Sequence, residues 1–500
     1  MSARPDDHDD DDDDAVVDDD LPGARFERRK RRVGLWAGPA IAVGVYLLTR
    51  DGPAPTLAAL MTLAVAWWMT EALPAAAVAL VVAALTVVTG VAEPRQAFGA
   101  FGSPLLFMFV GAFFIAEAMK VHGLGQRVAA ATAVLARGPT SLMMALSATA
   151  FVLSMMTSNS ASTAIVLPIA LAASEGMGRR YQAALVLAIA WGASMGGLAT
   201  PVGTPPNLIG IAELRKRDVD LGFGTWMAVG LPLGLAMLAT MWAVLLALFG
   251  LRGARAPRMP GRDDLPTARA RRPWSRGERA TLAALGVAVI GWIAPSALAV
   301  VAPGGAAATW ARAHLSEETV AVLAGCLLFV LPGGPPAQPR PALTWTEATR
   351  IDWGVILLFG GGMLLGDLAR STGLTHAWGQ ELVALTGAHS MWAVVALCTG
   401  VSILLSEATS NTATATLMVP LAASLATAAG DSPVPAVLGA TIGASFGFMM
   451  PISTAPNAMA YGSGKVTMGQ MMRAGVVFDV IGFAVVVGGL WVLCPLLGLV

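Results

Sequence analysis

Two short clusters of hydroxyl and amide side chains interrupt apolar stretches of the sequence. They span residues 154–163 and 406–414, and each contains a Ser-Asn-Ser or Ser-Asn-Thr triplet. A proline follows eight residues after the last residue of each triplet, at Pro168 and Pro420. A single cluster of this kind is typical of helix packing, because serine and threonine are common where membrane helices meet. Two copies in matching surroundings favour a binding site.

Each cluster has a downstream partner that combines helix-breaking residues with hydroxyl groups and a closing asparagine. The partners are residues 196–207, which end at Asn207, and residues 447–457, which end at Asn457. A simple kink needs only one proline, whereas these stretches add glycines, hydroxyls and an amide. Proline and glycine in the middle of a membrane span free backbone carbonyls and amides, which the broken helices of transporters use to bind ions and substrates.

The residue types in these four segments suit a small cation together with an anion. Sodium is a hard cation that takes oxygen ligands, as calcium and magnesium do, and hydroxyls, asparagine carbonyls and freed backbone carbonyls supply such oxygens. An anion takes hydroxyl and amide donors and the partly positive N-termini of helices. Neither hydroxyl cluster contains an arginine or a lysine. Bound cations would therefore compensate the charge of the anion.

Apolar segments of about twenty residues, the length of a membrane span, recur along nearly the whole chain. The chain is 56% hydrophobic and 13% charged, and the continuous apolar pattern favours helices over barrel strands. Two regions, 127–175 and 380–427, are too long for one span and are interrupted by the hydroxyl clusters. Because the interruptions carry small uncharged residues, we expect re-entrant hairpins whose tips stop inside the membrane. Full spans are expected near 33–49, 56–73, 75–91, 104–120, 181–211, 225–251, 280–303, 317–332, 352–370, 434–461 and 472–499.

The sequence therefore predicts an all-α polytopic membrane protein with about eleven transmembrane helices plus two re-entrant hairpins in two inverted repeats. After the first helix the spans form two groups of five, and an odd number of crossings inverts the second group. The expected divisions are a cytoplasmic tail (1–32), the first helix with the first repeat (33–251), an arginine-rich cytoplasmic linker (252–279) and the second repeat (280–500). The tail begins with a run of aspartates that we expect to be disordered and then becomes basic.

Several motifs spread over residues 33–500 resemble the divalent anion/sodium symporter family, which contains sodium–sulfate and sodium–dicarboxylate carriers. The resemblance lies in both hydroxyl clusters and in segments 67–74, 200–207, 353–362, 445–457 and 462–465. It implies a homodimer in the lipid bilayer of the cell inner membrane, with a scaffold part and a transport part that moves like an elevator. It also implies import of a small divalent anion, most simply a C4-type dicarboxylate, coupled to sodium ions, with no organic cofactor and no nucleic-acid partner.

The resemblance also implies which residues form the site. Two sodium sites combine oxygens from a hairpin tip and a helix break: Ser154, Ser158, Asn159 and Gly203 in the first half, and Ser406, Asn411 and Ser453 in the second. The substrate is expected between the tips, touching Asn159, Ser160, Asn411, Thr412 and Thr454. Small departures from the usual motifs, such as Ser160 where dicarboxylate carriers usually have threonine, leave the choice of anion open.

Other functions compete with this interpretation. A sodium-independent anion exchanger or a sulfate carrier would use the same fold. An intramembrane enzyme would need an aspartate pair, a serine–histidine dyad or a zinc motif, and no histidine lies beside the hydroxyl clusters; we therefore expect no enzymatic activity. A channel fits poorly, since paired inverted hairpins favour alternating access. Of the acids at or inside the spans, Glu407 adjoins the second cluster and is expected to anchor that hairpin.

The distribution of basic residues predicts the orientation of the chain. The expected spans place 25 of the 32 arginines and lysines on the cytoplasmic side, including six between positions 25 and 32 and nine in the linker 252–279. We expect the N-terminus in the cytoplasm and Val500 in the periplasm or outside the cell. Reporter fusions and cysteine accessibility at both ends test this prediction. A cytoplasmic Val500 would contradict the arrangement of two groups of five spans.

Overall fold

The computed structural model describes residues 24–251, 272–302, 304–374, 377–378, 381 and 390–500. The acidic start of the tail, most of the linker 252–279 and the first residues of the region 380–427 lie outside this part of the chain. The expectations for these segments therefore stay predictions.

The described residues are almost entirely helical, and their only β contact is one isolated bridge between Pro332 and Pro341. The prediction of an all-α protein is confirmed. In chain order the helices are α1 (Ala24–Leu48), α2 (Pro55–Thr70), α3 (Ala75–Val88), α4 (Pro94–Gly99), η1 (Ala100–Gly102), α5 (Pro104–His122), α6 (Leu124–Leu135), α7 (Pro139–Ser154), α8 (Asn159–Ala173), α9 (Arg179–Leu198), α10 (Pro205–Arg215), α11 (Phe223–Leu248), α12 (Arg276–Val301), α13 (Ala306–His314), α14 (Glu317–Leu327), α15 (Trp345–Ala348), α16 (Trp353–Ser371), α18 (Met391–Ala408), α19 (Asn411–Ala428), α20 (Pro433–Ala444), α21 (Ala455–Gly462) and α22 (Met468–Leu496).

Seven helices among the described residues are long and apolar enough to cross a membrane. The count of about eleven spans and the inverted orientation of the repeats stay predictions. The expected spans 181–211 and 434–461 are each two helices separated by an irregular break, as their glycines and prolines predict. Proline at the first or second position of α10 and α21 explains the restart, since a proline there needs no hydrogen-bond partner for its nitrogen.

The region 127–175 is also more divided than expected. It holds most of α6 as well as the hairpin of α7 and α8, and α6 packs against both hairpin arms. Pro139 begins α7 after the extended Gly138, so the chain turns there instead of continuing as one long arm. The second hairpin, α18 and α19, is divided as expected at its Ser-Asn-Thr cluster.

In each half of the chain, the first arm of the hairpin packs closely on a later helix at a glycine. In the first half, a Cβ added to Gly192 of α9 would lie 2.7 Å from the Ser147 carbonyl of α7. In the second, a Cβ on Gly443 of α20 would lie 2.7 Å from the Thr399 carbonyl of α18. Small residues spaced by four let helix backbones approach closely in membranes. The contact falls on the equivalent residue of each hairpin arm, because Ser147 and Thr399 both lie twelve residues before the asparagine of their tip.

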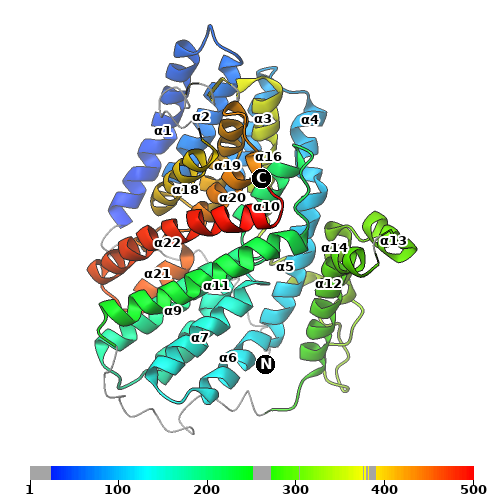
Figure 1. Ribbon diagram of the computed structural model, residues 1–500, viewed down its shortest axis with the longest axis vertical. Helices are drawn as coiled ribbons and strands as arrows, with labels where there is room; N and C mark the ends of the chain where they lie inside the picture. The colour runs from blue at the N-terminus through cyan, green and yellow to red at the C-terminus, as the bar shows by residue number, and fades with distance from the viewer. Residues whose placement is uncertain (1–23, 252–271, 303, 375–376, 379–380, 382–389) are drawn as a thin grey trace, which may run out of the picture.

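The two halves also interlock. The short helix α21 packs on α8 and α9, while α10 packs on α19 and α20, so each helix that follows a break touches the hairpin of the other half. Helix α9 lies in the interior, and its apolar stretch is wholly buried. Helix α11 packs on α9 and on α22 (Figure 1). Helices α12, α13 and α14 lie together along one edge of the molecule (Figure 1).

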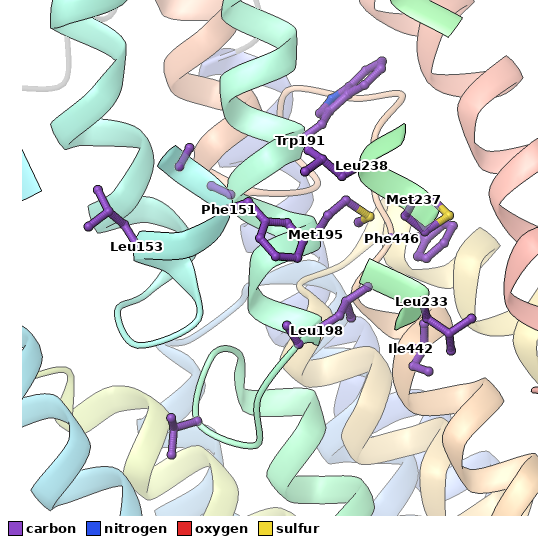
Figure 2. Packing of buried hydrophobic residues seen from close by; sticks show 14 of the residues in the cluster. Phe151, Leu153, Trp191, Met195, Leu198, Leu233, Met237, Leu238, Ile442 and Phe446 are labelled. Carbon is purple, nitrogen blue, oxygen red and sulfur yellow. The ribbon is translucent and has the colours of Figure 1, made fainter. Parts of the chain in front are cut away.

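Large side chains fill the interior where the halves meet. Figure 2 shows Met195 of α9 among Phe151 of α7, Met237 of α11 and Phe446 of the second half. Nearby, Trp191 stacks on Phe478 of α22 with ring centroids 5.2 Å apart. Aromatic pairs of this kind stabilise a core beyond the area they bury. The interior therefore holds the hairpins and breaks in a fixed mutual arrangement.

A buried ion pair joins the first hairpin bundle to α12. Arg127 of α6 donates from Nε to Glu278 Oε1 at 2.7 Å, and both side chains are less than a tenth exposed. The Arg127 guanidinium also donates to the carbonyls of Arg272 and Pro273 and lies 4.7 Å from the Trp274 ring centroid. Several donors and acceptors of both partners are satisfied, which is the condition under which a buried charge pair is tolerated.

Removing one partner of this pair should destabilise the protein strongly. Arg127→Ala leaves Glu278 buried without its counter-ion, a change that costs about 3–5 kcal/mol in other proteins. The matched control is Arg31→Ala, because the Arg31–Glu71 pair has side chains 58% and 50% exposed and exposed pairs contribute at most about 1 kcal/mol. Thermal melting in detergent should show a large drop for Arg127→Ala and a small one for Arg31→Ala. Equal drops would contradict the prediction.

Candidate functional site: two hairpin tips and two helix breaks

The hairpin tips repeat the same hydrogen bonds in both halves. Ser154 Oγ donates to Asn159 Oδ1 at 2.7 Å, and Ser406 Oγ lies at 2.9 Å from Asn411 Oδ1. In both, the serine is the fifth residue before an asparagine that begins the next helix, α8 or α19. The tips therefore present an asparagine at the N-terminal end of a helix, where the partial charge is positive.

Two further contacts close each tip. Ser158 and Ser410 cap α8 and α19, and their hydroxyls accept from the backbone nitrogens of Ala161 and Ala413, the third residue of each helix. Thr157 Oγ1 lies 2.6 Å from Ser162 Oγ, and Thr409 Oγ1 lies 2.7 Å from Thr414 Oγ1. Hydroxyls of the clusters thus serve partly to hold the turn in shape.

The helix breaks are closed by the two asparagines that end them. Asn207 donates from Nδ2 to the carbonyls of Gly197 and Thr200, both at 2.7 Å. Asn457 donates in the same way to Gly447 at 2.7 Å and Met450 at 3.0 Å. Each amide satisfies two carbonyls that the break frees, in an interior where water cannot do so. The Oδ1 atoms of both asparagines are buried without a hydrogen-bond partner among the described residues.

In the first half, the tip and the break meet at Gly197. A Cβ on Gly197 would lie 2.5 Å from Asn159 Oδ1 and 3.2 Å from the Gly203 carbonyl oxygen. Two of the oxygens expected to bind sodium therefore border the same small space. Thr200 adds a hydroxyl donor that ties the break to the carbonyl of Met155 at the tip.

In the second half, Glu407 ties the tip to the break. Its carboxylate accepts hydrogen bonds from the backbone nitrogens of residues 448–450, the shortest being 2.6 Å from Phe448, and from Ser453 Oγ at 2.9 Å. Ser406 Oγ also lies 2.8 Å from the Ala444 carbonyl just before the break. These contacts give Glu407 the anchoring position expected from the sequence.

The structure distributes the predicted site residues between buried and accessible positions. Ser154, Gly203, Ser406, Thr412 and Ser453 are buried, whereas Asn159, Ser160, Asn411 and Thr454 are partly exposed. Ser158 is exposed, and its hydroxyl caps α8. Thr454 begins α21, which packs on α8, so the second break reaches the first hairpin. Which of these groups bind an ion or a substrate stays a prediction.

Sequence reasoning missed Asp479. This acid lies on α22 with only 5% of its surface exposed, its two carboxylate oxygens lack a hydrogen-bond partner among the described residues, and it is close enough to Glu407 for the two carboxyl groups to interact. An acid inside a long apolar helix is a signal for function by default, and that signal was present in the sequence. Its link to Glu407 was not, since only the fold brings the two helices together.

The basic cluster at 215–217 is neutralised by acids. Lys216 pairs with Asp367 at 2.8 Å and Arg217 with Glu213 at 3.1 Å, while Arg215 pairs with Glu318 and lies near Asp220. These basic residues are the main group that the sequence places on the external side. The charge rule counts basic residues and not net charge, so these ion pairs do not remove the exception that the cluster makes to the predicted orientation.

Paired hairpins and helix breaks that carry hydroxyl and amide groups are features of membrane transport proteins. The profile of the citrate transporter family matches residues 65–443 and 310–499, so this chain belongs to that family. The expected similarity to divalent anion/sodium symporters is confirmed.

Curated relatives extend along nearly the whole chain. The sodium-dependent dicarboxylate transporter SdcS of Staphylococcus saprophyticus is 29% identical over 486 residues, covering 93% of this chain and 91% of that protein. SdcS of Staphylococcus aureus strain RF122 is 30% identical over 448 residues, covering 86% and 84%.

Two solved structures share the fold. The YdaH transporter of Alcanivorax borkumensis has a TM-score of 0.54 at 14% identity and covers 82% of this chain and 88% of its own. MtrF of Neisseria gonorrhoeae, an efflux pump, has a TM-score of 0.53 at 11% identity and covers 81% and 83%. At these identities the likeness concerns the fold alone.

A methyl group at Gly197 should disturb the first predicted ion site. Gly197→Ala places its Cβ against Asn159 Oδ1 and the Gly203 carbonyl, so these oxygens must move apart. A ligand that binds only the folded protein raises its melting temperature, and we expect Gly197→Ala to reduce the rise caused by sodium. Gly286→Ala on α12 is the control, because nothing lies within 4 Å of a Cβ there. An unchanged response to sodium in Gly197→Ala would contradict the expected position of the site.

Proposed function

We propose that this chain is a secondary transporter that imports a small divalent anion, of the C4-dicarboxylate type, together with sodium ions. The observation that carries the proposal is the pair of equivalent sites rich in hydroxyl, amide and carbonyl groups, with no arginine or lysine in residues 154–163, 196–207, 406–414 or 445–457. The names of the staphylococcal relatives, which are sodium-dependent dicarboxylate transporters, support the same function.

The proposed binding of sodium follows from the oxygens at each half. Ser154, Ser158, Asn159 and the Gly203 carbonyl would bind one ion, and Ser406, Asn411 and Ser453 would bind the other. These are hydroxyl, amide and carbonyl oxygens, which suit a hard monovalent cation. Asn159 and Asn411 can serve both ligands, because the amide carbonyl faces the cation while the amide nitrogen donates to the anion.

The proposed substrate lies between the two tips. Ser160, Thr412 and Thr454 would donate hydroxyls to it, beside the amides of Asn159 and Asn411. A C4-dicarboxylate has one carboxylate for each tip, in keeping with the two-fold arrangement. We further propose that the protein is a homodimer of the inner membrane, with its N-terminus in the cytoplasm, and that the hairpin-bearing part moves against a scaffold like an elevator.

Uptake into proteoliposomes tests the proposal. Labelled succinate should accumulate when an inward sodium gradient is imposed and should fall to background when choline replaces sodium. Asn159→Ala and Asn411→Ala should abolish this uptake while the protein remains folded by size-exclusion chromatography, because each change leaves neighbouring donors and acceptors unpaired. The control is Leu404→Ala, on the hairpin that carries Asn411. Leu404 is 68% exposed, and this variant should transport normally.

Other outcomes point to specific alternatives. Uptake that is unchanged in choline would favour a sodium-independent exchanger. Sodium-dependent uptake of sulfate without any response to succinate would keep the coupling and change the substrate. Near-normal uptake by both asparagine variants would move the site away from the hairpin tips.

A further inference from the structure

Asparagine is concentrated at the site to an unusual degree. The 500-residue chain contains four asparagines, and they are Asn159, Asn207, Asn411 and Asn457. Two begin the hairpin helices α8 and α19, and two close the helix breaks before α10 and α21. A residue used only to satisfy freed carbonyls could be replaced by other donors. The restriction of asparagine to these four positions indicates that both ends of its side chain are used.

The orientation of the two break asparagines is fixed by their donors. The two N–H groups of Asn207 are taken up by the carbonyls of Gly197 and Thr200, and those of Asn457 by Gly447 and Met450. A flipped amide would place its carbonyl oxygen against two other carbonyl oxygens, so this assignment follows from the hydrogen bonds. Each Oδ1 therefore has a set direction, away from the backbone that the amide holds.

Both of these oxygens lack a partner. Asn207 and Asn457 have no exposed surface, and neither Oδ1 accepts a hydrogen bond from any described residue. Buried polar atoms in proteins are nearly always satisfied, so each exception needs a physical reason. The same exception occurs at equivalent positions in both halves, which a local packing defect would not explain.

The positions of the two oxygens connect them with the predicted ion sites. Asn207 holds the carbonyl of Gly197, whose Cα side faces Asn159 Oδ1 and the Gly203 carbonyl. Asn457 holds the carbonyl of Gly447, whose Cα side faces Ser453 and the Ser406 carbonyl. In each half, a single glycine, Gly197 or Gly447, therefore lies between the break asparagine and the oxygens expected to bind a cation.

We propose that Oδ1 of Asn207 and Oδ1 of Asn457 are cation ligands, one at each of the two sodium sites. This inference rests on the proposed coupling to sodium and adds two binding residues to it. Each asparagine then has two tasks: its amide nitrogen closes the helix break, and its carbonyl oxygen faces the ion. The ion would therefore stabilise the break as well as balance the charge of the substrate.

The test compares variants that all lose the amide donors but differ in whether an oxygen remains at the Oδ1 position. Asn→Asp and Asn→Ala both remove the amide donors, but Asp keeps an oxygen at the same position and adds a negative charge, whereas Ala supplies neither. The variants are Asn207→Asp, Asn207→Ala, Asn457→Asp and Asn457→Ala. The measurement is the sodium concentration that gives half of the full rise in melting temperature, in detergent without substrate and with choline holding the ionic strength constant.

We expect both alanine variants to need about tenfold more sodium or to lose the response, which is the scale of loss when a supporting group of a metal site is removed. The aspartate variants should respond at lower sodium than the alanine variants. Gln182→Ala is the matched control, because Gln182 is a buried amide that donates to the Ser174 carbonyl away from the site. It should melt earlier and keep the wild-type half-saturating concentration.

The outcomes distinguish a failure of the proposed sodium coupling from a failure of the proposed asparagine ligands. A wild-type protein that does not respond to sodium would reject the proposed coupling and this inference together. A wild-type response with alanine variants that melt earlier but keep the wild-type half-saturating concentration would reject this inference alone, because the asparagines would then only close the breaks. If the Asn207→Ala protein does not fold, the Asn457 variants decide the question in the second half.

Discussion

A helix that breaks inside a membrane frees backbone carbonyls and amides, and no water is available to satisfy them. Much of the arrangement around the site of this protein depends on that constraint. Asn207 and Asn457 take up two carbonyls each. The carbonyl of Gly203 remains beside Asn159 Oδ1, at the space next to Gly197. Under the proposed function, the carbonyl that these side chains do not satisfy would face a bound ion.

The two halves meet the constraint by different chemistry. In the first half, Thr200 donates to the backbone carbonyl of Met155 at the hairpin tip. In the second, the link starts from the tip: Glu407 stands four residues before Asn411, as Met155 does before Asn159, and its carboxylate accepts from three successive backbone nitrogens of the break. Gly447 has φ +145°, a conformation that glycine adopts far more readily than other residues. The second break therefore turns its amides inward and requires an acceptor, which Glu407 provides.

The sequence predicted those parts of the site that depend on local pattern. The hydroxyl clusters divide the hairpins at Ser154–Asn159 and Ser406–Asn411, and the proline-rich segments break the following helices. Contacts between distant segments could not be predicted, such as Asp479 of α22 against Glu407 or the acids that neutralise the cluster at 215–217. The sequence also did not separate α6 from the hairpin, because its apolar residues continue the pattern of α7.

The charge of the site gives sodium coupling a physical basis. A dianion between the tips would meet the N-terminal ends of α8 and α19, and each helix end offers only about half a charge. The hydroxyl clusters and breaks provide no basic residue, and burying an uncompensated charge is costly. In the second half, Glu407 adds a negative charge that the nitrogens of residues 448–450 offset.

Positive charge sufficient for a dianion would then have to enter the site together with the dianion. Under the proposed function, two cations held by oxygens of the tips and breaks meet this requirement, so the anion would bind poorly without them. Coupling would thus follow from the absence of a fixed positive charge, whereas a permanent arginine at the same place would allow the anion to bind alone.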